Sequence, residues 1–469
     1  KISPRTNCGT TTLGDSGDSF VIPSGVTITN NGTQTGFGRT GTVDWQTSIK
    51  TADFTAVSGE GYFVNTTSGG VTVTLPSSPS AGAIVAVKDY ANTADTNKIT
   101  FNRNGSNIDG GTSSPIVKNE GGAVTLVYAD ATKGWLVTDA AQKSDIGFPT
   151  FITATGGTIT ESGNFKIHTF TGPGTFTVCS VGNACGSNSV DYLVVAGGGG
   201  GGHGQACFQA GGAGGGGGYR ESSGTASGGY TVSPLGACVS ALPVTATGYP
   251  VTVGAGGAGA PNSQAPNPGG SSGSNSVFTG STTITSAGGG GGSGYDGSTP
   301  NTAGAPGGSG GGNGTINAPT PGLSPIAAAT GNQPPVSPPQ GNPGGRASQA
   351  PFGSNHSAGG GGGATSAGGN GDASGTGGNG GTGGTSSING TPTQRAGGGS
   401  GASDTNAAGS VSGGGGVGGG NPLGPSNRVN GTPGTTNTGG GGGGGAAGAS
   451  GAPAATGGSG GSGIVIIRY

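Results

Sequence analysis

Alternating apolar and polar residues predict short β-strands in the first part of the chain. Clear examples are Gly61-Tyr-Phe-Val-Asn and Val71-Thr-Val-Thr-Leu-Pro, with apolar side chains at every second position. This period of two is typical of half-buried strands. We therefore expect residues 51–142 to form a compact sandwich-like or jelly-roll-like meander of strands. Residues 1–50 are expected to precede it as an attachment segment, with one strand pair around Asp18-Ser-Phe-Val-Ile-Pro and Gly25-Val-Thr-Ile-Thr.

The same period of two continues through residues 143–196, which we expect to form a β connector. Phe165-Lys-Ile-His-Thr-Phe and Gly174-Thr-Phe-Thr-Val-Cys alternate in this way. Asp191-Tyr-Leu-Val-Val-Ala is almost entirely apolar and runs directly into a block of glycines that starts at Gly197. A buried strand that feeds a glycine block indicates that the glycines continue an ordered core.

Glycine blocks and loops rich in Pro, Ser, Thr and Asn then alternate to the end of the chain. The 469 residues include 119 glycines and 29 prolines, a composition for which a disordered linker is the default expectation. No fixed period is evident among the blocks, so we do not expect a collagen-like chain or a solenoid of equal repeats. Two interpretations remain, a flexible tether and a lattice of extended glycine strands.

The apolar ending Gly463-Ile-Val-Ile-Ile-Arg-Tyr favours the lattice, because such a strand needs a partner, for which Leu193-Val-Val is the obvious candidate. A polyproline-II strand has three residues per turn and no internal hydrogen bonds. Without Cβ atoms, neighbouring strands can approach and pair these backbone groups. We expect residues 197–469 to form a layered polyglycine-II bundle with long loops, closed by strand 463–469. The scaffold glycines include Gly197, Gly214, Gly359, Gly413 and Gly439.

The fold class expected for the whole chain is all-β plus irregular structure, with essentially no α-helix. Only 7% of the residues are charged and the net charge is −2, so no basic patch is available for nucleic acid. No apolar stretch is long enough to cross a membrane. The acidic residues are few and dispersed, the three histidines are scattered, and no CxxC motif occurs. We therefore expect no catalytic residues, no metal and no cofactor.

Five cysteines leave the redox state open. Cys179 with Cys185, and Cys207 with Cys238, could each close a loop by a disulfide, which would leave Cys8 unpaired. Such bonds would suit a protein outside the cell. Spacing alone does not decide connectivity, and free buried thiols are nearly as well supported.

The chain resembles bacteriophage tail-fibre proteins over most of its length. Gly61-Tyr-Phe-Val-Asn-Thr-Thr-Ser-Gly-Gly-Val-Thr-Val-Thr-Leu-Pro is similar to a β module common in these fibres, and the N-terminal segment looks like the one preceding it in marine phages. The second half looks like the glycine-rich domain of phage fibres and of adhesins with a polyglycine-II core. The motifs that carry this likeness are Phe170-Thr-Gly-Pro-Gly-Thr-Phe-Thr-Val, Asp191-Tyr-Leu-Val-Val-Ala-Gly-Gly-Gly-Gly and Gly463-Ile-Val-Ile-Ile-Arg-Tyr.

The resemblance implies a glycine scaffold with loops that contact the host surface. The loops between blocks are 219–230, 261–278, 295–306, 315–342 and 422–438. The receptor-binding candidates are Tyr219, Tyr230, Phe278, Tyr295, Phe352 and Arg428, and all but Phe352 lie in these loops. The alternative for the aromatic residues is that each plugs the end of a glycine layer.

The expected function is that of a virion structural protein, a tail fibre or fibre-tip adhesin that forms a homotrimer. Its expected partners are other tail, baseplate or fibre-shaft proteins and a bacterial surface glycan or outer-membrane protein. Two other classes remain open. One is a subunit of a secreted extracellular filament, in which terminal strands pair with a neighbour. The other is a glycan-degrading tail spike, which would need two carboxylates close together.

Overall fold

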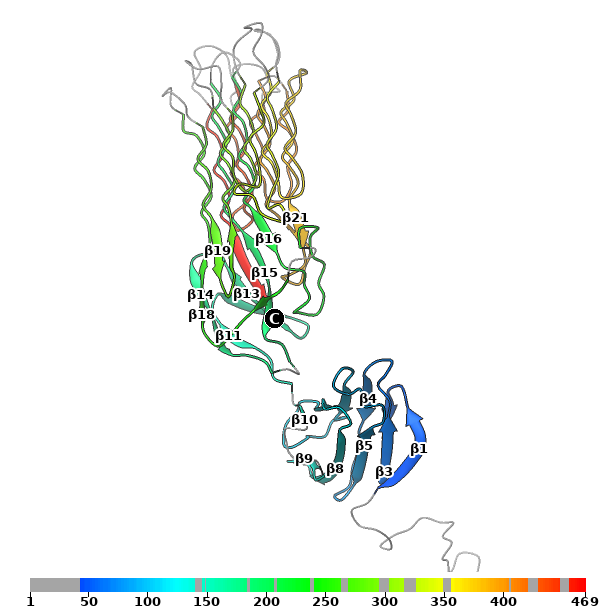
Figure 1. The fold of residues 1–469 in the computed structure, drawn as a ribbon. Coiled ribbons are helices and arrows are strands. Elements are labelled where there is room, and N and C mark those ends of the chain that lie inside the picture. Colours follow the sequence, from blue (N-terminus) through cyan, green and yellow to red (C-terminus); the bar gives the residue numbers. More distant parts are fainter. Residues whose placement is uncertain are drawn as a thin grey trace, which may run out of the picture. The chain divides into compact units, whose positions relative to one another are not determined.

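The structure is a computed structural model, and its described residues form strands, turns and extended segments without a helix. They divide into two compact units, Lys1–Gly147 and Phe148–Tyr469 (Figure 1). The expectation of an all-β chain with irregular segments is confirmed. The strand pair expected around residues 18–29 lies outside the described residues. The described residues are 43–139, 146–147, 149–183, 186–205, 209–236, 240–262, 269–294, 303–315, 326–348, 356–404, 406–420, 429–447 and 455–469.

The first unit contains two five-stranded sheets, with strand orders β1-β3-β5-β8-β9 and β10-β7-β6-β4-β2. Their apolar faces meet where the rings of Phe54 and Tyr62 lie 4.7 Å apart between centroids. Val64, Val73 and Trp135 are fully buried. The strands are β1 Asp44–Lys50, β2 Phe54–Thr55, β3 Glu60–Val64, β4 Val71–Thr74, β5 Ile84–Asp89, β6 Ile99–Asn102, β7 Ile116–Val117, β8 Ala123–Asp130, β9 Gly134–Val137 and β10 Ile146–Gly147.

The order of strands in this unit differs from the expected meander. From β1 to β6 the chain passes from one sheet to the other at every strand, so β1, β3 and β5 are parallel neighbours, as are β2, β4 and β6. The alternating pattern shows which face of a strand is buried but carries no information about its neighbour. The boundary expected at residue 50 is also wrong, because β1 pairs with β3 and belongs to the same sheet.

The second unit begins as a sandwich of two antiparallel sheets, β11-β14-β18-β19-β20 and β12-β13-β23-β15-β16. Phe176, Tyr192, Phe278 and Val465 meet in the core between them. The strands are β11 Thr153–Thr155, β12 Thr158–Ser162, β13 Phe165–Phe170, β14 Gly174–Ser180, β15 Ser189–Val195, β16 Tyr219–Glu221, β17 Leu242–Pro243, β18 Gly248–Thr252, β19 Ser276–Thr279, β20 Thr283–Ser286, β21 Gly384–Ser386, β22 Thr393–Arg395 and β23 Ile464–Arg468.

The C-terminal strand lies where the sequence predicts it. β23 pairs with β15 on one side and β13 on the other, with Leu193 opposite Ile466. The connector 143–196 and the glycine region 197–469 are therefore not separate domains. From Phe148 onward they form one compact unit, because strands from both parts alternate in the same sheets.

The sheet register continues without a break into the glycine segments. Val195 lies opposite Ile464 at the end of β15 and β23. Beyond the sheet, Gly198 N donates to Gly461 O and Gly201 N donates to Gly458 O. Each of these pairs lies three residues further along the first segment and three residues earlier in the second than the pair before it. These extended segments make up the long bundle above the sheets in Figure 1. We call them the glycine bundle, formed by residues 197–204, 209–218, 254–260, 269–275, 287–294, 303–315, 326–331, 341–348, 356–383, 396–404, 406–420, 429–447 and 455–463.

The backbone hydrogen bonds of the interior segments repeat every three residues, as in polyglycine II. In 197–202, successive N–H groups donate to three different antiparallel segments, and successive carbonyls accept from three parallel ones. Gly197 and Gly200 donate to the carbonyls of Ser274 and Ser271. Gly198 and Gly201 donate to those of Gly461 and Gly458, and Gly199 and Gly202 to those of Gly215 and Gly212. From the three parallel segments, Gly289 and Gly292 donate to the carbonyls of Gly197 and Gly200, Gly257 and Ala260 to those of Gly198 and Gly201, and Gly442 and Gly445 to those of Gly199 and Gly202.

Segments on the outside of the bundle have a period of three residues, although no fixed period was expected among the glycine blocks. Residues 376–384 read Thr-Gly-Gly-Asn-Gly-Gly-Thr-Gly-Gly, and residues 456–463 read Thr-Gly-Gly-Ser-Gly-Gly-Ser-Gly. The side chains of Asn379, Thr382 and Ser459 are exposed, whereas most glycines between them are buried or half-buried. With three residues per turn, one position in three faces outward and can carry a side chain.

Polar side chains close the edge of the bundle where no further glycine segment follows. Asn379 Oδ1 accepts from Ser410 N at 2.8 Å, and Asn430 Oδ1 accepts from Thr456 N at 2.9 Å. Thr432 Oγ1 accepts from Val417 N at 2.7 Å. These contacts satisfy backbone donors that an interior segment would pair with a neighbouring carbonyl.

Candidate functional site

The candidate site is the end of the glycine bundle remote from the sheets, which we call the tip. Gly204 pairs with Ala455 there, nine residues beyond the end of β15, which corresponds to about 28 Å at 3.1 Å per residue. The sheet register therefore extends as a rigid frame to the point where the chain reverses. The connections that join described segments at this end are 206–208, 263–268, 295–302, 316–325, 349–355, 421–428 and 448–454, and their own residues lie outside the described part.

Small apolar side chains replace glycine close to the tip. Ala210, Ala358, Ala402 and Ala447 come from four different segments and form one buried cluster. Their methyl groups pack together among segments that stay paired by backbone hydrogen bonds, since Ala358 N donates to Ala402 O at 2.9 Å. The cluster therefore adds apolar side-chain packing to the backbone contacts near the tip.

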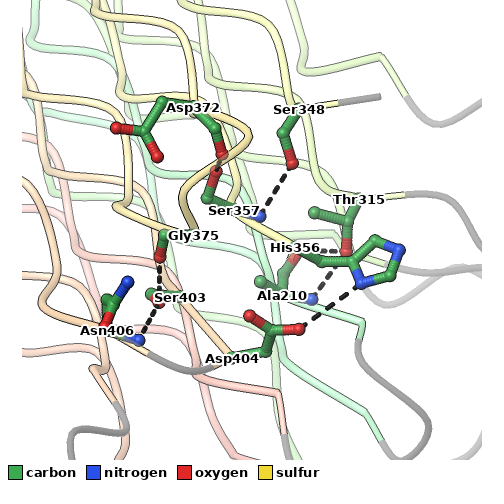
Figure 2. A network of polar contacts seen from close by, with 10 residues as sticks. All are labelled: Ala210, Thr315, Ser348, His356, Ser357, Asp372, Gly375, Ser403, Asp404 and Asn406. Atoms are coloured by element: carbon green, nitrogen blue, oxygen red, sulfur yellow. Dashed lines mark hydrogen bonds and ion pairs between the residues drawn. The ribbon is translucent and has the colours of Figure 1, made fainter. Parts of the chain in front are cut away.

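Side-chain hydroxyl groups link neighbouring segments at the same level (Figure 2). Thr315 Oγ1 accepts from Ala210 N at 2.7 Å, and Thr315 N donates to Ala210 O at 3.0 Å. Ser348 Oγ accepts from Ser357 N at 2.9 Å, and Ser348 N donates to Ser357 O at 2.8 Å. The Ser348–Ser357 pair joins the two segments on either side of connection 349–355, whereas the Thr315–Ala210 pair joins segments that lead to two different connections.

A short turn at residues 372–375 is held by three further hydrogen bonds. Ser357 Oγ donates to Asp372 O at 2.6 Å, Ser403 Oγ donates to Gly375 O, and Asn406 Nδ2 donates to Ser374 O at 2.6 Å. Partial burial raises the pKa of the Asp372 carboxyl, but hydrogen bonds from Thr376 N and from Ser374 outweigh it and hold the pKa below its usual value.

One buried histidine–carboxyl contact lies beside these serines. His356 Nδ1 is 3.4 Å from Asp404 Oδ2, and both side chains are almost completely buried. Asp404 N also donates to His356 O at 3.2 Å, and the adjacent residues Ser357 and Ser403 form an antiparallel bridge. Figure 2 shows the two side chains pointing toward one another between two bundle segments. The pair therefore joins two segments that lie far apart in sequence.

Two of the aromatic receptor-binding candidates are in the wrong place for that role. Tyr219 begins β16 and is 1% exposed, and Phe278 lies in β19 with no exposed surface. Both are core residues of the sheets. Each ring lies near the junction with the bundle and fills space inside the sandwich. This correction supports the alternative that such rings plug the ends of glycine layers.

The remaining candidates are distributed between the sheet end and the undescribed connections. Tyr230 is half-buried near the sheets, with its ring 5.3 Å from the guanidinium carbon of Arg468. Its segment, 219–230, is therefore a loop at the sheet end and not at the tip. Tyr295, Phe352 and Arg428 lie outside the described residues.

The predicted scaffold glycines fall into two groups. Gly197, Gly214 and Gly359 lie in the bundle, where an added Cβ would come within 2.1 Å of a backbone oxygen. Gly413 and Gly439 have positive φ angles of 58° and 69°, so they form turns at which the chain enters a block. Cys179 is exposed and carries a free thiol, whereas Cys8, Cys185, Cys207 and Cys238 lie outside the described residues.

Within the described ranges, no group of three or more His, Cys, Asp or Glu side chains could hold a metal ion. In the same part of the chain there is no helix with the length and apolar character needed to span a bilayer. The polar groups described at the tip are backbone amides, hydroxyl groups, the Asp372 carboxyl, the Asn406 amide and the buried His356–Asp404 contact.

Residues 170–469 match the family model described as a glycine-rich domain. The chain belongs to this family. The match begins at the last residue of β13 and includes strands β14 to β23 and the whole bundle, whereas β11, β12 and the rest of β13 precede it. These bounds agree with the motifs at Phe170 and Tyr469 on which the expected likeness to a glycine-rich domain depended. No curated protein gives a significant match to the chain.

Proposed function

We propose that this glycine-rich protein is a structural protein of a bacteriophage particle, a tail fibre or fibre-tip adhesin. Its glycine bundle would present the tip connections to a bacterial surface glycan or outer-membrane protein. The observation that carries the proposal is the register that runs unbroken from β15 and β23 to the Gly204–Ala455 pair. A rigid frame that carries several chain connections at its far end is an arrangement suited to recognition by loops.

The proposal is for binding and not for catalysis. Recognition would be multivalent, with weak sites multiplied by a homotrimer of the chain and by the number of fibres on the particle. The N-terminal part would attach to other tail, baseplate or fibre-shaft proteins. A secreted filament in which terminal strands pair with a neighbour is less well supported, because the C-terminal strand β23 is already paired on both sides, with β13 and β15.

The test compares the purified full chain with a tip variant on a panel of bacterial cells and their isolated surface polysaccharides. In the variant, residues 295–302, 349–355 and 421–428 are replaced by Gly/Ser sequences of equal length, which removes Tyr295, Phe352 and Arg428. We expect the wild-type chain to bind at least one strain and the variant to lose at least tenfold in affinity while its melting temperature stays unchanged.

The control changes the opposite end of the same unit. Ser281→Ala in the turn between β19 and β20 alters an exposed residue near the sheets and should leave cell binding intact. Equal binding by the wild-type chain and the tip variant would place recognition elsewhere and contradict the proposal. Release of shortened polysaccharide by the wild-type chain would indicate the tail-spike function instead. Light scattering on the free chain tests the trimer.

A further inference from the structure

The end of the second unit opposite the tip contains an apolar cavity of about 430 Å³. It lies where β13 and β15 begin and β23 ends, next to the segment that leads into β11. Its wall includes Ile152, Phe165, Ala226 and Tyr469, and Phe151 lies at its mouth with 64% of its surface exposed. We call this the basal cavity. Its volume is within the range of small-molecule sites, which are mostly apolar with a few polar groups that orient the ligand.

The basal cavity is built largely by residues outside the family match. Phe151, Ile152, Phe165 and Lys166 precede residue 170, where the glycine-rich domain begins. They belong to β13 and to the segment that leads into β11. The cavity is therefore a feature of this chain's own N-terminal addition to the domain and is separate from the tip.

One cationic side chain stands among these apolar groups. Lys166 lines the cavity and is exposed, and Glu161 is its cross-strand neighbour on β12. Burial lowers the pKa of His168, and the positive charge of Lys166 adds to this effect. His168 stays in place through hydrogen-bond contacts with Gly156 O at 2.7 Å and with the Tyr469 hydroxyl at 3.1 Å. The cavity therefore combines an apolar interior with a positive charge that a ligand's anionic group could meet.

We propose that the basal cavity binds a single-chain amphiphile with a carboxylate head group, such as a free fatty acid. Its hydrocarbon tail occupies the space between Ile152, Phe165 and Tyr469, and its carboxylate pairs with the Lys166 ammonium. A neutral sugar fits less well, because the wall is mostly apolar and offers few hydrogen-bonding groups. This function is additional to host recognition at the tip and does not depend on it.

The experiment is titration calorimetry of the full chain with octanoate, decanoate and dodecanoate below their micelle concentrations. We expect one saturable site, with binding that tightens by about fourfold for each added methylene until the cavity is full. Ala226→Leu, which adds carbon atoms to the wall, should abolish binding. Lys166→Gln should weaken it about tenfold and remove most of its dependence on salt. Arg346→Gln, which removes an exposed charge on the bundle, should leave binding unchanged.

Several outcomes would overturn the proposal. One is the absence of saturable binding by the wild-type chain, and another is equal binding by the wild-type chain and Ala226→Leu. Should Ala226→Leu fold poorly, Phe151→Ala at the exposed mouth replaces it and must weaken binding of the longest chain. Association with phosphatidylglycerol vesicles that persists in Ala226→Leu would indicate a surface effect. Dimers of the wild-type chain that Phe151→Ser dissociates would show that the face is an interface between two copies.

Discussion

At many interior glycines of the bundle there is no room for a side chain as small as that of alanine. A Cβ on Gly199 would lie 2.1 Å from Gly290 O, and one on Gly201 would lie 2.0 Å from Gly443 O. The atoms in the way are backbone atoms of segments that are themselves surrounded, so they have no rotamer into which they can move. The glycines are therefore required by the distance between neighbouring backbones.

The first prediction concerns Gly199→Ala. We expect it to lower the free energy of unfolding by about 3 kcal/mol or more, because the methyl group overpacks a site bounded by backbone. Gly172→Ala is the control, since a Cβ at Gly172 meets nothing within 4 Å. Denaturant unfolding of both variants checks this difference. A Gly199→Ala protein as stable as the control would mean that the segments are more loosely packed than the structure has them.

His168 supplies a second prediction at the scale of one residue. Burial lowers the pKa of this imidazole from its usual 6.5, so the folded protein holds His168 in the neutral form. Between the lowered pKa and 6.5 the unfolded chain binds more protons than the folded one. The contribution of His168 to stability is therefore present above pH 6.5 and is lost as the pH falls through the folded value.

Thermal unfolding between pH 7.5 and pH 5 measures this effect. We expect the wild-type melting temperature to fall with acidification and His168→Gln to show a flatter dependence over the same range. The control is His356→Gln, which changes the buried tip residue paired with Asp404. If the dependence of the melting temperature on pH disappears in His356→Gln and persists in His168→Gln, the acid sensitivity belongs to the tip and the prediction is wrong.

At the scale of elements, strands become polyglycine-II segments without a change of partner. β18 and β19 pair as Val251 with Phe278, and the continuing segments pair as Ser274 with Ala255 and Ser271 with Ala258. Only the period of the hydrogen bonds changes, from two residues in the sheet to three in the bundle. The sheets therefore set the register of the bundle, which has few side chains of its own to define one.

The outer segments yield a prediction about the edge of the bundle. Asn430→Ala removes the acceptor for Thr456 N and should cost about 1 kcal/mol of stability, the usual net contribution of a hydrogen bond. The matched control is Thr435→Ala on the same exposed segment. Amide exchange at Thr456 should accelerate in Asn430→Ala only. Unchanged exchange there would show that water satisfies the donor equally well.

At the scale of the whole molecule, the chain consists of two units with different sources of stability. The first, Lys1–Gly147, depends on apolar side chains between two sheets. The second, Phe148–Tyr469, adds to such a sandwich a bundle held by a three-dimensional network of backbone hydrogen bonds. Buried backbone groups that are paired on several sides open to solvent only when several segments separate together.

Hydrogen exchange read by mass spectrometry tests this description. Peptides covering 197–202, 214–218 and 440–445 should exchange slowly, and those covering 254–260 should exchange faster. Residues 254–260 form an outer segment, in which Gly257 and Ala260 donate inward to Gly198 and Gly201 while Ala255 and Ala258 are exposed. Its amides are therefore closer to solvent than those of the interior segments. Uniformly fast exchange across all glycine blocks would support the flexible tether and remove the frame on which the proposed function depends.

The sequence by itself determined where many of the strands lie, that the glycine region is ordered, and with which strand the last one pairs. Alternation located residues 61–64 and 165–170, and the apolar ends at Leu193 and Ile466 identified each other because a buried strand needs an apolar partner. The family match over residues 170–469 agrees with those end motifs. These features are local, since each is encoded in a few consecutive residues.

Only the tertiary structure decided which residues surround each glycine and which faces remain open. The parallel order of β1, β3 and β5, the burial of Tyr219 and Phe278, the His356–Asp404 pair and the basal cavity all join residues distant in the chain. Glycine carries no side chain that could specify a neighbour. A glycine block therefore shows that another backbone segment can approach closely, but not which segment it is. The sheets at the base settle that question, because their register is transmitted along the bundle to the tip.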